Sequence, residues 1–271
     1  MVYTRRKFLK TLAVSAGAAF ASTLIGCGSS DDSEANGPDT STEPSLLDGT
    51  QFFPQSVVSG DPRQDAVILW TRVDNGSGED TPLVLQVSES ESFETLVVEQ
   101  SFETLANYDN CLKVRVAELK PGQHYYYRFI YETGGELYTS RVGRTKTAAA
   151  TDTDTKVTFA YVSCQDYIGR YFNNYLSILD NDDLDFVVHL GDYIYETTGD
   201  ALFQSTGGER SIAFTDSDGA LSIGVGESAT QAANSLDNYR QLYKTYRTDT
   251  LLQRVHERFP MIAIWDDHEF S

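Results

Sequence analysis

The chain has 271 residues, enough for one large or two ordinary domains, and its formal net charge is -19. A protein this acidic repels phosphate backbones, which excludes non-specific binding of nucleic acid. An anionic substrate would need local positive charge, and bound metal ions can supply it.

Residues 1–26 have the features of an export signal. The twin arginines Arg5 and Arg6 precede an apolar run, residues 12–25, that is too short and too weakly hydrophobic for a transmembrane helix. The run ends in Leu-Ile-Gly-Cys at residues 24–27, which resembles a bacterial lipobox and predicts lipidation of Cys27. The alternative is an ordinary cleaved signal with a cysteine there by chance. We expect twin-arginine export and a membrane-anchored lipoprotein of the periplasm or cell surface.

Residues 27–50 and 51–147 differ in composition and pattern. The first stretch is polar and almost free of apolar residues until Leu46, so we expect a flexible linker. The second holds short strand-like segments separated by turns, which favours an all-β sandwich. Residues 112–116 alternate, placing Leu112, Val114 and Val116 on one face of a strand. Further strands are expected at residues 66–73, 83–88 and 125–131.

The pattern changes after a small polar linker at residues 145–155. From residue 155 to residue 271, strand-like and helical segments alternate. Strands are expected at residues 157–163, 186–190 and 261–265, with helical periodicity from Tyr171 to Leu179 and from Leu236 towards His256. This order predicts an α/β domain with a parallel sheet. Residues 197–232 are rich in Gly, Ser, Thr and Asp and are expected to be a long surface insertion.

Polar side chains follow each of the three expected parallel strands. They fall in residues 163–166 (Ser-Cys-Gln-Asp), residues 191–196 (Gly-Asp-Tyr-Ile-Tyr-Glu) and residues 265–269 (Trp-Asp-Asp-His-Glu). Because open α/β sheets bind ligands at the carboxyl ends of their strands, we expect these three clusters to meet at one rim. Asp192 and Tyr195 are both oxygen donors, which suit a hard trivalent cation. Gly191 would let the backbone turn sharply or approach another group closely.

The cysteines leave two alternatives open. If Cys27 is lipidated, Cys111 and Cys164 remain, and in an oxidising compartment their default is a disulfide. The other interpretation makes Cys164 a thiolate ligand of a metal and Cys111 a structural thiol. We favour the second, because Cys164 follows a strand of the α/β region whereas Cys111 belongs to the β-sandwich.

Two family resemblances are carried by these motifs. The Pro121-Gly122 turn and the tyrosines at residues 126–127 resemble a fibronectin III or Ig-like module. The three rim segments resemble the metallophosphatase superfamily, with Ser-Cys-Gln in place of its first motif and Asp267 in place of an asparagine in its third. These departures, the twin-arginine signal and the preceding β-sandwich are shared with the PhoD-type alkaline phosphatases and phosphodiesterases.

The resemblance implies an αββα catalytic domain that holds ferric iron and calcium. Cys164 and Tyr195 would bind Fe³⁺, Asp192 would bridge metals, and Asp267 would bind a second metal. Carboxylates suit Ca²⁺, and a metal pair can activate water and stabilise phosphoryl charge. His268 would hydrogen-bond a phosphate oxygen or protonate the leaving alkoxide.

Other polar residues near these motifs receive supporting roles. We expect His189 to be a core histidine or to support a ligand rather than to bind metal. Asp166, Asp266 and Glu196 are candidates for hydrogen-bonding the ligands. Arg240 and Arg247 could contact phosphate, but we favour a solvated helix face for both.

These observations predict an exported metal-dependent phosphoesterase that hydrolyses phosphate monoesters, diesters or both with a metal-activated water. We expect a monomer whose partners are a phosphate ester and, through its lipid anchor, a membrane. Since members of the resembled family continue beyond the third motif, we also expect an incomplete catalytic domain. The alternative is a non-catalytic, lipid-anchored surface binding protein with a decayed or truncated phosphatase domain. A serine esterase is disfavoured because the chain lacks a Gly-x-Ser-x-Gly elbow.

Overall fold

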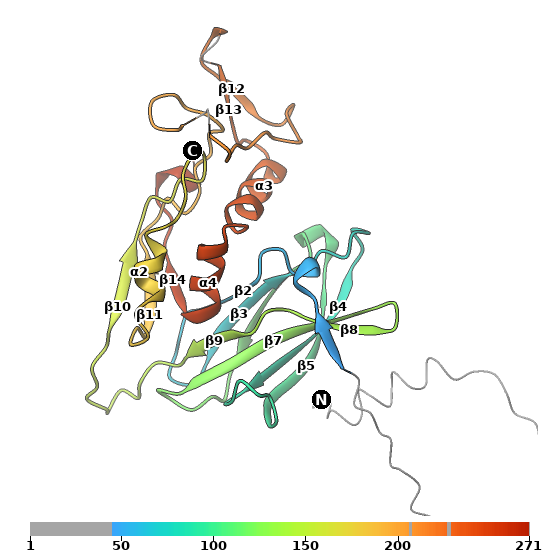
Figure 1. The fold of residues 1–271 in the computed structure, drawn as a ribbon, viewed down its shortest axis with the longest axis vertical. Coiled ribbons are helices and arrows are strands. Elements are labelled where there is room, and N and C mark those ends of the chain that lie inside the picture. Colours follow the sequence, from blue (N-terminus) through green and yellow to red (C-terminus); the bar gives the residue numbers. More distant parts are fainter. Residues whose placement is uncertain (1–44, 206–207, 227–228, 271) are drawn as a thin grey trace, which may run out of the picture.

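The computed structural model describes residues 45–205, 208–226 and 229–270 (Figure 1). The export signal, Cys27 and most of the expected linker lie outside these ranges. No helix within the described ranges is long and apolar enough to cross a membrane. The described strands form two six-stranded sheets and one two-stranded sheet.

The first sheet has the order β1-β8-β7-β4-β5, with β9 also paired to β7. Its members are β1 (Leu46–Asp48), β4 (Thr81–Ser88), β5 (Leu96–Thr104), β7 (His124–Thr133), β8 (Glu136–Thr139) and β9 (Gly143–Lys146). Two sequence expectations need correction here. The end of the expected flexible linker is ordered, because β1 pairs in parallel with β8, and the polar stretch from residue 145 begins inside β9.

The second sheet runs β10-β11-β14-β2-β3-β6 and joins the two halves of the chain. Its strands are β2 (Val57–Gly60), β3 (Val67–Arg72), β6 (Cys111–Val116), β10 (Phe159–Val162), β11 (Phe186–His189) and β14 (Met261–Ala263). The strands β10, β11 and β14 are parallel, as expected, whereas β2, β3 and β6 are antiparallel. The two sets meet where Met261 pairs with Gly60, so the parallel strands continue directly into the β-sandwich.

The sandwich core lies between the antiparallel half of this sheet and the first sheet. Its buried side chains alternate along the strands, as in β3, where Val67 and Leu69 point inward while Ile68 and Trp70 do not. In β6 the same alternation buries Leu112 and Val116 with Val114 packed beside them, which confirms the expected period of two. Large aromatic side chains of β7, including Tyr125, Tyr127 and Phe129, fill the opposing layer. Short 3₁₀ turns η1 (Thr50–Phe52) and η2 (Ala106–Tyr108) lie between strands of this region.

Three helices cover one face of the parallel strands (Figure 1). They are α2 (Tyr175–Leu179), α3 (Leu236–Tyr246) and α4 (Thr250–Arg258). The helix expected from Tyr171 is shorter, and the periodicity from Leu236 to His256 belongs to two helices rather than one. The second break has a local cause: Asp249 caps α4 by accepting the backbone N–H groups of Leu251 and Leu252.

The expected surface insertion at residues 197–232 is partly buried. It contains the hairpin β12 (Leu221–Ile223) and β13 (Thr230–Ala232), but Ile212 and Phe214 pack into the core under the helices. The segment is mostly polar, and these two apolar residues do not belong to any periodic pattern, so no pattern in the sequence indicated their burial. Residues 197–232 therefore form an insertion that lies mainly at the surface, as expected, but that also contributes Ile212 and Phe214 to the core.

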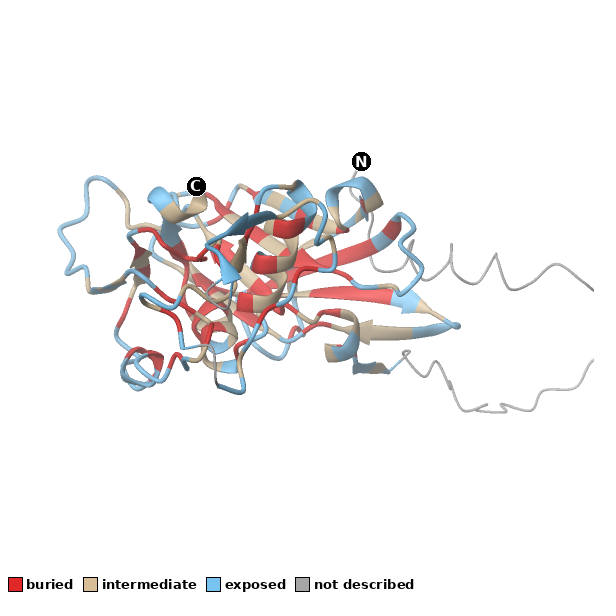
Figure 2. Cartoon of the chain, turned by 90° about the horizontal axis from the view of Figure 1, so that it is seen from above, coloured by how far each residue is buried: buried red, intermediate tan, exposed pale blue. Residues whose placement is uncertain are grey.

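The other face of the parallel strands is bare in the described chain. Register places Ala160, Val187 and Met261 in one row, and this row packs against the helices. The alternate row contains Tyr161, Val188 and Ile262, of which Tyr161 is 71% exposed and Ile262 is 41% exposed. The helices therefore cover one face of these strands and the other face is exposed, whereas in the sandwich the inner faces of two sheets cover each other; Figure 2 shows the chain coloured by burial.

Candidate metal centre

The three polar clusters meet at the carboxyl ends of β10, β11 and β14. Backbone hydrogen bonds join the loops: Cys164 N–H donates to the Gly191 carbonyl at 3.1 Å, and Gln165 N–H donates to the Asp192 carbonyl at 3.0 Å. Ile264 N–H donates to the His189 carbonyl, continuing the ladder towards the third cluster. The parallel register thus brings residues separated by about a hundred positions to a common rim, called the metal rim below.

Two non-glycine residues at the metal rim adopt left-handed backbone conformations. Cys164 has φ of 59° and Asp192 has φ of 54°. Such conformations are costly for residues with a Cβ, and they concentrate at functional sites where the surrounding structure holds them. Here the loop-to-loop hydrogen bonds of the same residues supply that support.

Gly191 permits the close approach of the third loop. Its φ is +108°, and a Cβ at this position would lie 2.5 Å from Asp266 Cβ and 2.8 Å from Asp266 N. Any side chain would push the third cluster away from the second. The expectation of a close backbone approach at Gly191 is therefore confirmed.

Asp192 lies at the centre of the donor atoms. Its Oδ2 accepts hydrogen bonds from the Cys164 thiol at 3.3 Å and from the Tyr195 hydroxyl at 3.5 Å. Its Oδ1 is buried and has no hydrogen-bond partner among the described residues. A buried carboxylate oxygen without a partner is costly unless a cation binds it, so Asp192 fits a metal ligand.

The phenol of Tyr195 lies next to the ionisable side chains of Cys164 and Asp192. Burial, followed by the neighbouring Cys164 and Asp192, raises the pKa of the Tyr195 phenol well above its ordinary value. A bound cation would reverse this balance, because it stabilises phenolate, thiolate and carboxylate together. The side chains of Cys164, Asp192 and Tyr195 are therefore better suited to binding a cation than to forming a polar cluster without one.

Asp192, Asp267 and His268 each offer a ligand atom, and these atoms lie within 4.8 Å of one another. Asp267 and His268 belong to the 3₁₀ turn η4 (Asp267–Glu269), which follows β14. Asp267, the predicted ligand of a second metal, is exposed and therefore accessible to an ion. Cys164 and Tyr195 approach the same carboxylate from the other loops, so the structure brings together all four predicted ligands.

His268, the predicted catalytic residue, is fixed by Glu196. Its Nδ1 lies 2.6 Å from Glu196 Oε2, and its ring lies over the Tyr195 ring with centroids 4.2 Å apart. Burial opposes protonation of His268, but the hydrogen bond and charge of Glu196, with Asp192 and Asp267, raise its pKa above the ordinary value. This arrangement leaves Nε2 as the atom through which His268 can act on a ligand.

The remaining expected supporting residues are placed as follows. Asp166 is buried and accepts hydrogen bonds from Ile168 N, Gln204 Nε2 and Tyr246 Oη; burial raises its pKa. Asp266 caps η4. His189 is fully buried and accepts from Gly191 N through Nδ1, and burial lowers its pKa to about 4, but its Nε2 has no partner among the described residues.

Sequence reasoning missed two positioning residues. Glu269 accepts the backbone N–H groups of Asp192 at 3.2 Å and of Tyr193 at 2.6 Å, and it also accepts Asp266 N–H. Gln165 donates from Nε2 to the Tyr193 carbonyl and accepts from the Tyr175 hydroxyl. The signal for Glu269 was present, because Asp266-x-x-Glu269 has the spacing of a capping box. No comparable signal marked Gln165.

Other expectations about cysteine and arginine are also resolved. Cys111 and Cys164 are both free thiols, so the disulfide alternative is not realised. Arg240 contacts the Asn107 carbonyl, and Arg247 stacks on Trp70 rather than on the metal rim. The expectation of a solvated helix face for Arg247 was wrong, because the β-sandwich lies against this side of α3.

Comparison with known proteins agrees with the geometry. The family model described as PhoD-like phosphatase matches residues 159–271, and the one described as its N-terminal domain matches residues 40–149. Alkaline phosphatase D of Bacillus subtilis (strain 168) is 34% identical over 225 residues, which cover 80% of this chain and 35% of that protein.

A solved structure described as PhoD is 33% identical, with a TM-score of 0.66, and the match covers 84% of this chain and 41% of that one. The chain thus spans well under half the length of both relatives. Because two models of the same family together match most of its residues, the chain belongs to the PhoD-like phosphatase family.

Proposed function

We propose that the metal rim is the centre of a metal-dependent phosphoesterase that hydrolyses phosphate monoesters, diesters or both. The observation that carries this proposal is the convergence of Cys164 and Tyr195 on Oδ2 of Asp192, whose other carboxylate oxygen, Oδ1, is buried without a partner among the described residues. Three acidic or ionisable donors in contact need a cation to be stable as anions. The similarity to alkaline phosphatase D of B. subtilis supports the reaction class.

The donor chemistry supports Fe³⁺ and Ca²⁺ as the metals. Cys164 and Tyr195 would hold Fe³⁺, because thiolate and phenolate neutralise its charge, while Asp192 would be shared between metals and Asp267 would hold Ca²⁺. When bound, such ions can activate a water molecule and stabilise charge on a phosphoryl group.

The chain's own residues orient these groups and the substrate. Glu269 fixes the backbone of Asp192 and Tyr193, which keeps the Asp192 carboxylate aimed at the metal rim. Glu196 holds Nδ1 of His268 and thereby directs Nε2 outward, where it can hydrogen-bond a phosphate oxygen or give a proton to the leaving alkoxide.

A second sheet on the bare face would complete an αββα catalytic domain. The exposed side chains on or beside this face include Phe159, Tyr161, Ile262 and Ile264. Apolar surface of this extent is typical of an interface. Because the family relatives are much longer than this chain, we propose that their remaining residues supply the covering layer.

The proposed iron site can be tested by spectroscopy. Protein loaded with Fe³⁺ should show a visible phenolate-to-iron charge-transfer band, which Tyr195→Phe should remove while Tyr239→Phe, on α3, should keep it. Metal analysis and a generic phosphodiester assay of the same samples would test function. Full activity in colourless, iron-free protein would contradict the assignment, and metal binding without turnover would favour the alternative of a surface binding protein.

We also propose twin-arginine export and anchoring through Cys27, on the basis of the lipobox-like residues 24–27. Cys27→Ala should release the protein from membranes into the soluble fraction after fractionation of cells, whereas Cys111→Ala should leave its distribution unchanged. Persistent membrane association of Cys27→Ala would refute a lipid anchor. We expect the protein to act as a monomer without a nucleic-acid partner, and light scattering would reveal a stable dimer.

A further inference from the structure

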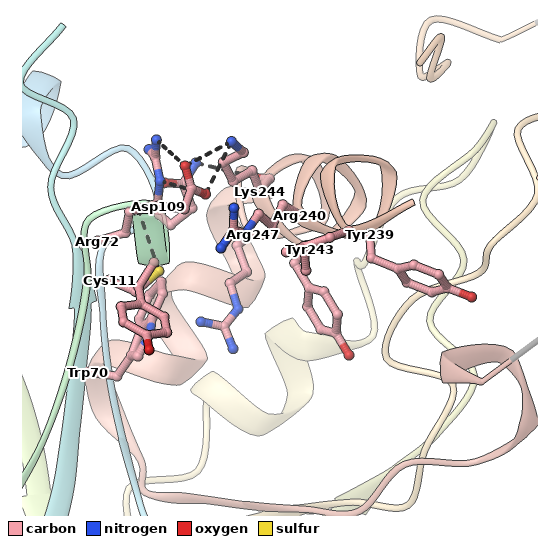
Figure 3. Close-up of a pocket in the computed structure, with 12 residues that line it drawn as sticks. Trp70, Arg72, Asp109, Cys111, Tyr239, Arg240, Tyr243, Lys244 and Arg247 are labelled. Atoms are coloured by element: carbon pink, nitrogen blue, oxygen red, sulfur yellow. Dashed lines mark hydrogen bonds and ion pairs between the residues drawn. The ribbon is translucent and has the colours of Figure 1, made fainter. Parts of the chain in front are cut away.

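A second site lies between the β-sandwich and α3, away from the metal rim. It is a cavity of about 310 Å³ lined by residues of β3, of the turn before β6 and of α3 (Figure 3). None of Cys164, Asp192, Tyr195, Asp267 and His268 lines it. Its volume lies at the lower end of the range for small-molecule sites, which is about 300–1,000 Å³.

The cavity concentrates positive charge on a strongly acidic chain. Four basic side chains line it: Arg72 from β3, Arg240 and Lys244 from α3, and Arg247, the residue that caps the C-terminus of α3. Arg240, Lys244 and Arg247 are spaced i, i+4 and i+7, so they project from one side of the helix and its C-terminal end. The one acid among the described lining residues, Asp109, is shared between Arg72 at 3.2 Å and Lys244 at 3.1 Å. In a protein of net charge -19, such a cluster favours an anionic ligand.

Arg247 is the least satisfied of these cations. Its guanidinium lies over the Trp70 ring, 4.3 Å from the centroid, and its Nε is buried without a hydrogen-bond partner among the described residues. No carboxylate of the described chain forms an ion pair with it. A guanidinium held over an indole ring by a cation–π contact, with no carboxylate partner, can donate its terminal N–H groups to phosphate oxygens.

Aromatic side chains supply the other half of the site. Figure 3 shows Arg247 between Trp70 and Tyr243, with Tyr239 further along α3, and the exposed Tyr108 also lines the cavity. Flat aromatic faces bind planar rings by stacking, which an aliphatic phosphate could not use. Arg247 and Trp70 also line a neighbouring hollow that extends to Glu269, the residue that positions the Asp192 loop.

We propose that this cavity binds a small organic phosphate that carries an aromatic ring, of the size and charge of a nucleoside monophosphate. The phosphate is held by Arg247 and Lys244, and the ring stacks among Trp70, Tyr239 and Tyr243. The site is distinct from the metal rim, so binding does not depend on hydrolysis.

Isothermal titration with adenosine 5′-monophosphate tests this proposal. The titration is made with the Asp192→Asn protein, so that the metal rim does not consume the probe. Adenosine 5′-monophosphate should bind at least about tenfold more tightly than adenosine or inorganic phosphate alone, since only the nucleotide can use the charged hydrogen bonds and the aromatic stacking together. Adding Arg247→Gln should weaken its binding by about tenfold or more, and adding Lys244→Gln, on the more accessible side of α3, should weaken it as well. Arg254→Gln, an exposed arginine of α4, is the matched control and should change nothing.

Four outcomes would overturn the proposal. They are the absence of saturable binding of adenosine 5′-monophosphate, unchanged affinity in both cavity variants, adenosine binding as tightly as its monophosphate, and inorganic phosphate binding as tightly as the nucleotide. Circular dichroism monitors folding, and if Arg247→Gln is unfolded, the comparison of Lys244→Gln with Arg254→Gln decides. Because the readout is binding in a background chosen to lack hydrolysis, failure of the phosphoesterase proposal would not affect it.

Discussion

The two halves of the shared sheet differ in direction, in coverage and in the loops that follow their strands. In the antiparallel half, β2, β3 and β6 bury one face against a second sheet, and among the described residues their connecting turns carry no cluster of candidate metal ligands. In the parallel half, β10, β11 and β14 end at one edge, and all the candidate metal ligands follow those ends. Antiparallel neighbours place successive loops at opposite ends of a sheet, whereas parallel neighbours gather them at the same end. The direction of strand pairing therefore explains why the candidate metal ligands gather in the parallel half of the sheet and not in the antiparallel half.

The largest expected contrast between the halves concerns activity. Asp192→Asn should lower phosphoester hydrolysis by several orders of magnitude, because the amide cannot supply the charge with which Asp192 would hold metal ions. Steady-state hydrolysis of a synthetic phosphodiester would measure the loss. Asp80→Asn, in the sandwich, is the matched control and should keep the wild-type rate. Comparable activity of the two variants would remove Asp192 from the centre of the site.

The next contrast concerns two glycines with positive φ. Gly191→Ala should destabilise the protein by about 2–5 kcal/mol, since strain in the backbone adds to the clash with Asp266. Gly76→Ala, in a sandwich turn with open space around the position, should cost only about 1–2 kcal/mol. Urea denaturation measures both. Equal losses would mean that the third loop can move away from Gly191 without cost.

The smallest expected effect is a pH dependence from the parallel half. Burial, with Arg247 and His189 nearby, holds the pKa of His256 well below its ordinary value of 6.5. Below pH 6.5 the unfolded state binds a proton that the folded state excludes, so stability falls as the pH falls, by about 1.4 kcal/mol per pH unit for this group. Between pH 8 and pH 5 the contribution is at most about 2 kcal/mol, the value reached if His256 stays neutral in the folded state.

His256→Gln isolates that contribution. Glutamine can retain a hydrogen bond to the Tyr193 hydroxyl, which His256 contacts at 2.8 Å, but it does not titrate. The loss of unfolding free energy from pH 8 to pH 5 should therefore be about 2 kcal/mol smaller in this variant. An identical loss in both proteins would show that His256 is protonated in the folded state.

Local sequence pattern was sufficient for most strands and for the order of elements in the second half. Alternation in residues 112–116 and the apolar runs before Gly191 and Trp265 predicted strands that the structure contains, because side-chain periodicity follows directly from backbone geometry. Short strands such as β1 and β8 were missed, since three or four residues give too little periodicity to detect. The insertion was predicted to lie at the surface from its polar composition, and for that reason the burial of Ile212 and Phe214 was not predicted.

The sequence by itself determined which residues could bind a metal and on which strand ends they would lie, because motif chemistry and strand direction are local properties. Only the tertiary structure decided that β14 pairs with β2, that Glu269 positions the loop of Asp192, and that Arg247 lies over the Trp70 ring. Each of these contacts joins segments more than seventy residues apart, and such pairings depend on the packing of whole layers rather than on any pattern within a segment.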